Sequence, residues 1–288
     1  MSPFAASLEE LQEGFRYFGV PTDAPGFCDH PAFLELEQRN PEILNLYAAF
    51  VAKRHYTQEY LDRAVAVISR ASGLLHRELV RHGRLGACVD ISGILSRLLD
   101  REQIWNCGIK GSLTITFPLE SGVEPRYFWS CDHGQFTAGH AWLFAPPFTV
   151  VDISVRQQPY DVQEASYIPD TVLSTDTHPV EVSVEDIVSP SARAEMLQQG
   201  IPPQHHLEAG ARYIPGIFQA FTPIVVSGLN GASLKYSPVA VHASDGTFEE
   251  MRNMDFDGLS PWELYVQRIQ PHLRAACTGR LPWTLAIV

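Results

Sequence analysis

The chain of 288 residues contains only five cysteines and no stretch of 18 consecutive apolar residues. Five cysteines are too few, and odd in number, for a disulfide framework in a chain of this size, so at least one thiol is free or pairs with another molecule. Without a long apolar stretch, no helix is expected to cross a bilayer. The first fifteen residues also lack the basic and apolar segments of a secretory signal, so we expect a cytoplasmic protein with no membrane partner.

Basic residues are scarce as well, with 21 Lys and Arg against 33 Asp and Glu and a formal net charge of −12. A net-acidic surface repels phosphate backbones, so nucleic acid is not an expected partner. Four catalytic signatures are absent: G-x-S-x-G, H-E-x-x-H, the Walker Gly-Lys-Ser/Thr and G-x-G-x-x-G. Their absence argues against elbow-type serine hydrolases, zincins, P-loop NTPases and Rossmann dehydrogenases, and we expect no cofactor.

The residues that are present indicate an α+β protein. Capping signals and apolar periodicity predict helices at 8–17 after Ser7, from Pro41 onward after Asn40, at 60–82 before Gly83, at 88–99, at 190–200 after Ser189 and at 264–273 after Ser260. Period-two patterns predict strands at 113–117, 138–144, 148–153, 223–226 and 239–242. The second and third strands are joined by Ala145-Pro146-Pro147, which indicates an antiparallel hairpin.

Three segments follow from this pattern. Residues 1–39 are predicted to form an N-terminal helical extension, and residues 40–160 a catalytic core in which 118–137 is an insertion. Residues 161–288 are predicted to form a C-terminal α/β extension whose role the sequence does not show.

Cys88 is the cysteine whose surroundings suggest chemistry. It lies two residues after Gly86, in the first turn of the helix predicted for 88–99. The unpaired N–H groups and partial positive charge at a helix N-terminus favour a thiolate, which is the nucleophilic form of cysteine. The same N–H groups could donate to an oxyanion formed by attack on a carbonyl.

His140 and Asp152 supply the base and the orienting group that a nucleophilic cysteine needs. If the hairpin turn is centred on Pro146, paired positions sum to 292, and 140 + 152 = 292. The two side chains are then predicted to be direct cross-strand neighbours on one face. Trp142 alternates with His140 on the same strand, and either lines the substrate groove or belongs to the core.

Four strings together carry a resemblance: Gly86-Ala87-Cys88-Val89-Asp90-Ile91-Ser92-Gly93-Ile94-Leu95-Ser96-Arg97-Leu98-Leu99, Gly108-Ile109-Lys110-Gly111, Gly139-His140-Ala141-Trp142-Leu143-Phe144 and Thr149-Val150-Val151-Asp152-Ile153-Ser154. In order and spacing they resemble the core of the transglutaminase-like superfamily over about residues 85–155. The resemblance implies a papain-like α+β fold in which a cysteine helix packs on an antiparallel sheet. It also implies that Cys88 is the nucleophile, His140 the base and Asp152 the orienter.

The function expected from these residues is acyl transfer through a thioester at Cys88. The preferred outcome is hydrolysis of a peptide or amide bond, with a polypeptide or a small amide as substrate. Cross-linking, deamidation and acyl transfer from a thioester donor use the same triad and stay open. An alternative of another class is a non-catalytic binding module with a degenerate site, in which residues 161–288 form a partner surface.

A zinc site is an alternative role for two of the other cysteines. The tripeptides Cys28-Asp29-His30 and Cys131-Asp132-His133 repeat one pattern, and two Cys-x-His pairs could form a Cys₂His₂ site. Their spacing is not that of a finger or ribbon, so we predict no metal. Cys107 and Cys277 are predicted to be packing residues, and His205-His206 a solvated loop.

Overall fold

The computed structural model of the chain describes residues 3–132, 139–210, 216–244 and 246–277. It is an α+β protein, about 49% helical and 17% strand, built on an antiparallel sheet that curves until it is nearly barrel-shaped. The sheet order is β5-β4-β3-β1-β7-β6, and β2 also pairs with β1. The strands are β1 (Cys107–Thr116), β2 (Arg126–Phe128), β3 (His140–Ala145), β4 (Phe148–Asp152), β5 (Val172–Ser174), β6 (Ile224–Ser227) and β7 (Ser233–His242).

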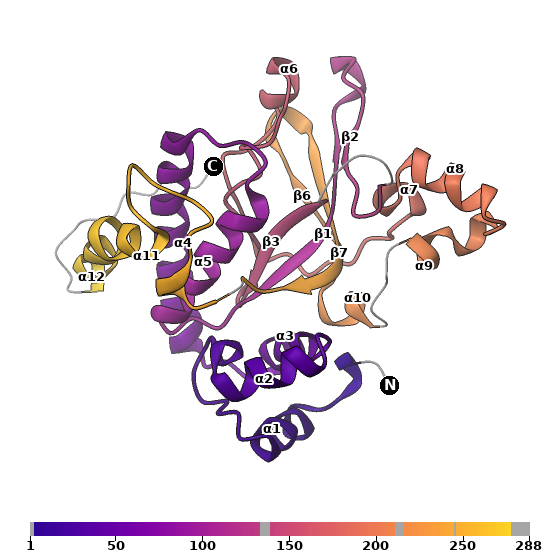
Figure 1. The fold of residues 1–288 in the computed structure, drawn as a ribbon. Coiled ribbons are helices and arrows are strands. Elements are labelled where there is room, and N and C mark those ends of the chain that lie inside the picture. The colour runs from indigo at the N-terminus through magenta and orange to yellow at the C-terminus, as the bar shows by residue number, and fades with distance from the viewer. Residues whose placement is uncertain (1–2, 133–138, 211–215, 245, 278–288) are drawn as a thin grey trace.

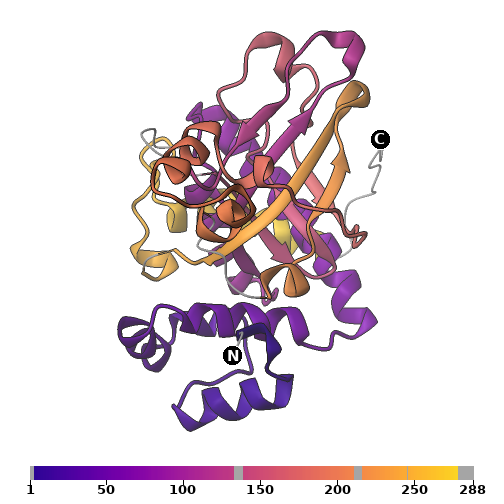
Figure 2. The same ribbon diagram turned by 90° about the vertical axis from the view of Figure 1, so that its right-hand side faces the viewer.

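Helices surround the sheet on several sides (Figures 1 and 2). The helices α1 (Leu8–Tyr17), α2 (Pro31–Arg39) and α3 (Ile43–Lys53) form a group beneath the sheet in both views, and α4 (Gln58–His82) and α5 (Cys88–Arg101) lie along one of its faces. The shorter helices are α6 (Val162–Ala165), α7 (Val184–Ile187), α8 (Pro190–Gln198), α9 (His206–Gly210), α10 (Ile217–Ala220), α11 (Pro261–Leu264) and α12 (Gln270–Cys277), with a π-helical turn at Tyr265–Ile269 between the last two.

Local signals explain where the predicted helices begin and end. Ser7 Oγ accepts from the backbone N–H of Glu10 at 3.2 Å, and the Glu10 carboxylate accepts from the N–H of Ser7 at 2.7 Å, so the predicted capping box is present. Gly83 ends α4 in the left-handed conformation with φ of 73°, which glycine adopts without strain. The helix predicted to begin at Pro41 instead begins at Ile43.

The alternation along the strands separates two hydrophobic cores. Trp142 and Val150 belong to a core rich in aromatic residues that extends to α1, α2 and α3. Leu143 and Val151 belong to a second core beneath α4 and α5. Because successive side chains of a strand point to opposite faces, β3 and β4 each contribute to both cores.

The sheet crosses the predicted segment boundary at residue 160. Strands β5, β6 and β7 all follow that residue, and β7 lies between β1 and β6. The helices before residue 40 are also packed on the core, where Phe27 contacts Trp105 with ring centroids 6.2 Å apart. The segment predicted as an insertion, 118–137, contains β2, whose Phe128 pairs with Leu113 of β1, so part of this segment belongs to the sheet.

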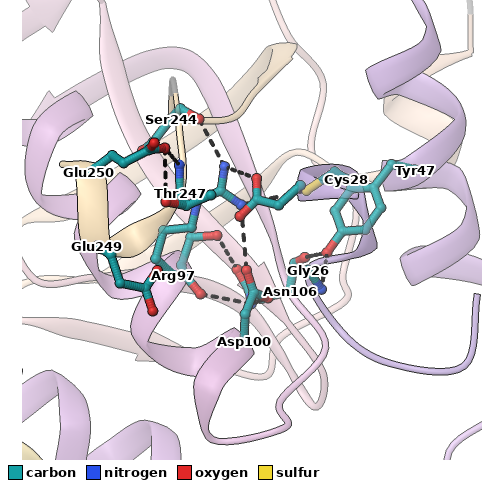
Figure 3. A network of polar contacts seen from close by, with 12 residues as sticks. Gly26, Cys28, Tyr47, Arg97, Asp100, Asn106, Ser244, Thr247, Glu249 and Glu250 are labelled. Atoms are coloured by element: carbon teal, nitrogen blue, oxygen red, sulfur yellow. Dashed lines mark hydrogen bonds and ion pairs between the residues drawn. The ribbon is translucent and has the colours of Figure 1, made fainter. Parts of the chain in front are cut away.

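A buried arginine on α5 connects three distant parts of the chain (Figure 3). Arg97 is 4% exposed and forms an ion pair with Asp29 at 2.6 Å, and its Nη2 donates to the carbonyl of Ser244 at 2.8 Å. Its Nη1 lies 3.6 Å from both Cys28 Sγ and Asp100 Oδ2. The N-terminal segment, the cysteine helix and the loop after β7 are therefore held together by one cation.

Membrane-spanning helices were sought among the described residues, and none has both the length and the apolar character that a bilayer crossing requires.

Candidate active site

Cys88 is the first residue of α5, as predicted, and its side chain is 3% exposed. Within the described residues no side-chain hydrogen bond caps this helix at Ala87, which leaves the N–H groups of the first turn able to meet another acceptor. Gly86 directs the chain into the helix with φ of 69°, and its N–H donates to the carbonyl of Gln157 at 2.9 Å. The start of the cysteine helix is therefore fixed to the loop that follows β4.

His140 lies at the point where β1 changes from one neighbouring strand to another. Residues 107–111 of β1 pair with β3, whereas 113–115 pair with β2, so β3 begins where β1 changes its partner. At that point Gly111 lies opposite His140, and a Cβ on Gly111 would come within 2.5 Å of the Trp142 ring. A side chain at Gly111 would therefore collide with the strand that carries the histidine.

His140 and Asp152 are in direct contact, and both side chains are buried. His140 Nε2 donates to Asp152 Oδ2 over 2.5 Å. The predicted register is wrong, however, because β3 pairs with β4 through Leu143 and Val151, whose numbers sum to 294, and an irregularity follows before Ala145. A shift of two residues keeps the same face, so the prediction that both side chains share a face is confirmed although they are not directly opposite.

The Asp152 carboxylate has a full set of donors. Oδ1 accepts from the backbone N–H of Ser154 at 2.9 Å and from its hydroxyl at 3.0 Å, and Oδ2 also accepts from the Tyr236 hydroxyl at 2.9 Å. Burial acts to raise the pKa of Asp152, but the His140 charge and these hydrogen bonds outweigh it and lower the pKa below the ordinary value. The carboxylate is therefore held ionised and in one orientation.

Burial opposes protonation of His140, yet the pKa of this imidazole is raised to about 10. The Asp152 charge and hydrogen bond make the largest favourable contribution, and Cys88 adds to it. The His140 Nδ1 atom is buried and makes no hydrogen bond to any described residue. One ring nitrogen is therefore fixed by Asp152, and the other is left for the cysteine.

Tyr236 is a member of the site that the sequence analysis missed. It comes from β7, 84 residues after Asp152, and its side chain is 1% exposed. The segment predicted for this part of the sheet, 239–242, does not include it. No motif surrounds Tyr236, so only the three-dimensional pairing of β7 with β1 reveals its contact with the carboxylate.

Trp142 lies in the core and is 2% exposed. Its ring stacks on the His140 ring with centroids 6.4 Å apart and meets the Tyr236 ring edge-on at 5.1 Å. It also lines a cavity of about 120 Å³ together with Phe144 and Phe221. Trp142 therefore packs against the predicted triad from within the core. Its contact with substrate stays a prediction.

The residues of the alternative zinc site make other contacts where the structure describes them. Cys28 lies beside Arg97, whose Nη1 is 3.6 Å from its sulfur, and burial raises the pKa of the thiol to about 12. His30 Nδ1 accepts from the N–H of Ala32 and caps α2. His133 lies outside the described residues, and the described part of the chain holds no group of three or more His, Cys, Asp or Glu arranged for a metal.

The remaining predictions for single residues have mixed outcomes. Cys107 is 2% exposed, as predicted for a packing residue. The side chain of Cys277 lies outside the described residues. His206 is 3% exposed and its Nε2 donates to the carbonyl of Ile201 at 2.9 Å, so the prediction that it belongs to a solvated loop is wrong, because the ring is sequestered by this bond.

Comparison with known proteins gives no relative: no family model matches the chain, no curated protein matches it, and no solved structure matches it.

Proposed function

We propose that the chain is a cysteine-dependent acyl-transfer enzyme that works through a thioester at Cys88. The observation that carries the proposal is the buried pair of His140 and Asp152, in which one imidazole nitrogen is fixed by the carboxylate and the other is left for Cys88. A nucleophile, a base and a group that orients the base are the parts that covalent catalysis by cysteine needs. The resemblance to the transglutaminase-like, papain-like core agrees with this arrangement.

Before the substrate is attacked, the thiol proton of Cys88 is held on His140 Nδ1, because the Asp152 charge favours the protonated ring. Asp152 stabilises the imidazolium that forms, and an imidazolium beside a cysteine favours the thiolate. The sulfur attacks the carbonyl carbon of an amide, and the carbonyl electron pair moves to oxygen. When the carbonyl re-forms, the C–N bond breaks and the imidazolium donates its proton to the leaving nitrogen.

The thioester is then resolved by water or by an amine. With water, His140 takes a proton from the attacking molecule and returns it to the Cys88 sulfur as the carboxylic acid leaves. Hydrolysis of a peptide or small amide is the outcome we propose, and transfer to an amine uses the same steps with a different acceptor.

Alkylation with iodoacetamide near neutral pH, followed by peptide mapping, tests the proposal. Exposure alone would favour Cys131, which is half-buried, over Cys88, which is 3% exposed. Burial raises the pKa of both Cys28 and Cys107, so these thiols are unreactive at neutral pH. We expect Cys88 to be labelled first, at least about tenfold faster than any other cysteine.

The same peptide map of alkylated cysteines can also contradict the proposal. Labelling that begins at Cys131 and leaves Cys88 unmodified would follow exposure alone, and would favour the binding-module alternative over an enzyme.

A further inference from the structure

One buried hydroxyl near the triad makes no hydrogen bond within the part of the chain that the structure describes. The Tyr160 side chain is half-buried, but its hydroxyl oxygen is shielded from solvent and makes no hydrogen bond to any described residue. A buried hydroxyl without a partner costs free energy, so such a group calls for an explanation, of which a catalytic role is one. The hydroxyl of Tyr236, by contrast, is fully used by Asp152.

The loop between β4 and α6 places Tyr160 beside the reacting groups. Its first part is fixed to Asp152 through Ser154, and its middle holds the start of the cysteine helix through the bond from Gly86 to Gln157. The backbone N–H of Tyr160 donates to the carbonyl of Gln158 at 2.8 Å, which turns the chain at the end of this loop. One short segment therefore sets the positions of the orienter, the nucleophile and Tyr160.

Aromatic packing connects the Tyr160 ring to His140 through Phe128. The Tyr160 ring meets the Phe128 ring edge-on with centroids 5.8 Å apart, and Phe128 lies 6.1 Å from the His140 ring. Burial is the largest cause of a raised pKa at Tyr160, and the charges of Asp152 and Cys88 add to it, which places both within electrostatic reach. The phenol therefore stays protonated and able to donate a hydrogen bond.

We propose that Tyr160 donates its hydroxyl hydrogen bond to the oxyanion formed when Cys88 attacks an acyl carbonyl. This rests on the proposed function and adds the side-chain donor that the sequence analysis did not identify. Preorganised donors act at the point where the carbonyl electron pair moves to oxygen, and they release the charge again when the carbonyl re-forms. The open N–H groups at the start of α5 supply the other donors.

The test compares two reactions of the same thiol in Tyr160→Phe. Acylation by p-nitrophenyl acetate passes through an oxyanion, whereas alkylation by iodoacetamide displaces iodide and forms none. We expect the rate of acylation at Cys88, measured by mass spectrometry of its peptide, to fall about 10²-fold. The rate of alkylation at Cys88 should stay within about twofold of the wild type, because the thiolate and its base are intact.

Tyr56→Phe is the matched control, because it also removes a buried tyrosine hydroxyl, which donates to the carbonyl of Val51 at 2.8 Å away from the triad. It should leave both rates unchanged. Equal losses of acylation and alkylation in Tyr160→Phe would overturn the proposal, because the hydroxyl would then act on the thiolate. Unchanged acylation would overturn it as well. Failure of the wild type to react at Cys88 is a different result, which would reject the proposed function itself.

Discussion

Replacing His140 by alanine is expected to lower the rate at which iodoacetamide alkylates Cys88 near neutral pH by about 10²–10⁴-fold. The wild-type imidazole can hold the thiol proton because the ionised Asp152 carboxylate accepts a hydrogen bond from its Nε2 and raises the pKa of the ring. Without the ring, the thiolate has lost both its base and its counter-charge. The measurement is the second-order rate constant for alkylation of the Cys88 peptide across pH 5–10.

The pH profile separates loss of the base from loss of structure. In the wild type the alkylation rate should persist toward acid pH, whereas in His140→Ala it should rise only as the pH becomes alkaline. His206→Ala is the control, because it removes another buried histidine that is bonded to a carbonyl outside the site, and it should leave the rate unchanged. An identical profile in the wild type and His140→Ala would show that the cysteine is not activated.

Replacing Arg97 by methionine is expected to lower the free energy of unfolding by about 3–5 kcal/mol, the usual cost of leaving buried charges without their partner. Methionine keeps much of the side-chain volume but removes the cation. Asp29 and Asp100 then lose the guanidinium, as does the carbonyl of Ser244. Denaturant unfolding followed by circular dichroism measures the change.

The loss of stability in Arg97→Met should increase as the pH rises. Burial raises the pKa of Asp29 to about 6 and that of Asp100 to about 7 even beside the arginine. A carboxyl whose folded pKa is raised contributes stability at low pH that is lost as pH rises through the folded value. Removing the cation raises both values further, so the deficit of Arg97→Met should be larger at pH 8 than at pH 5.

A second variant distinguishes the loss of the Arg97 charge from the loss of its packing. In Arg97→Met with Asp100→Asn, one of the two buried carboxyls is gone, and Asn106 Nδ2, which donates to Asp100 Oδ1 at 2.9 Å, keeps an acceptor. The double variant should recover part of the loss at pH 8 and little at pH 5. A deficit that is equal at both pH values and unaffected by Asp100→Asn would assign the role of Arg97 to packing alone.

Sequence periodicity was sufficient for the parts of the site that depend on nearby residues. The apolar pattern after Gly86 predicts a helix that begins at Cys88, and the structure has it there. The hairpin prediction places His140 and Asp152 on one face, and they are in contact. It fails on their register, because the irregularity between Leu143 and Ala145 shifts the pairing in a way that a symmetrical turn does not predict.

Contacts between distant segments could not be predicted in this way. Tyr236 joins Asp152 because β7 pairs with β1 across a long stretch of sequence, and no local pattern specifies that pairing. Likewise, Arg97 has the sequence context of a helix surface residue, and its burial depends on Asp29 and Ser244 closing over it. Short strands give weak patterns as well, which is why the three residues of β2 were not predicted.

The most direct test of a thioester mechanism is to trap the acyl group. The wild type is mixed with p-nitrophenyl acetate, quenched in acid and digested, and each cysteine peptide is weighed by mass spectrometry. The account predicts a burst of nitrophenolate and a hydroxylamine-sensitive acetyl group on Cys88, with neither in Cys88→Ala. Acetyl groups spread over the other cysteines, with Cys88 unmodified and no burst, would contradict it.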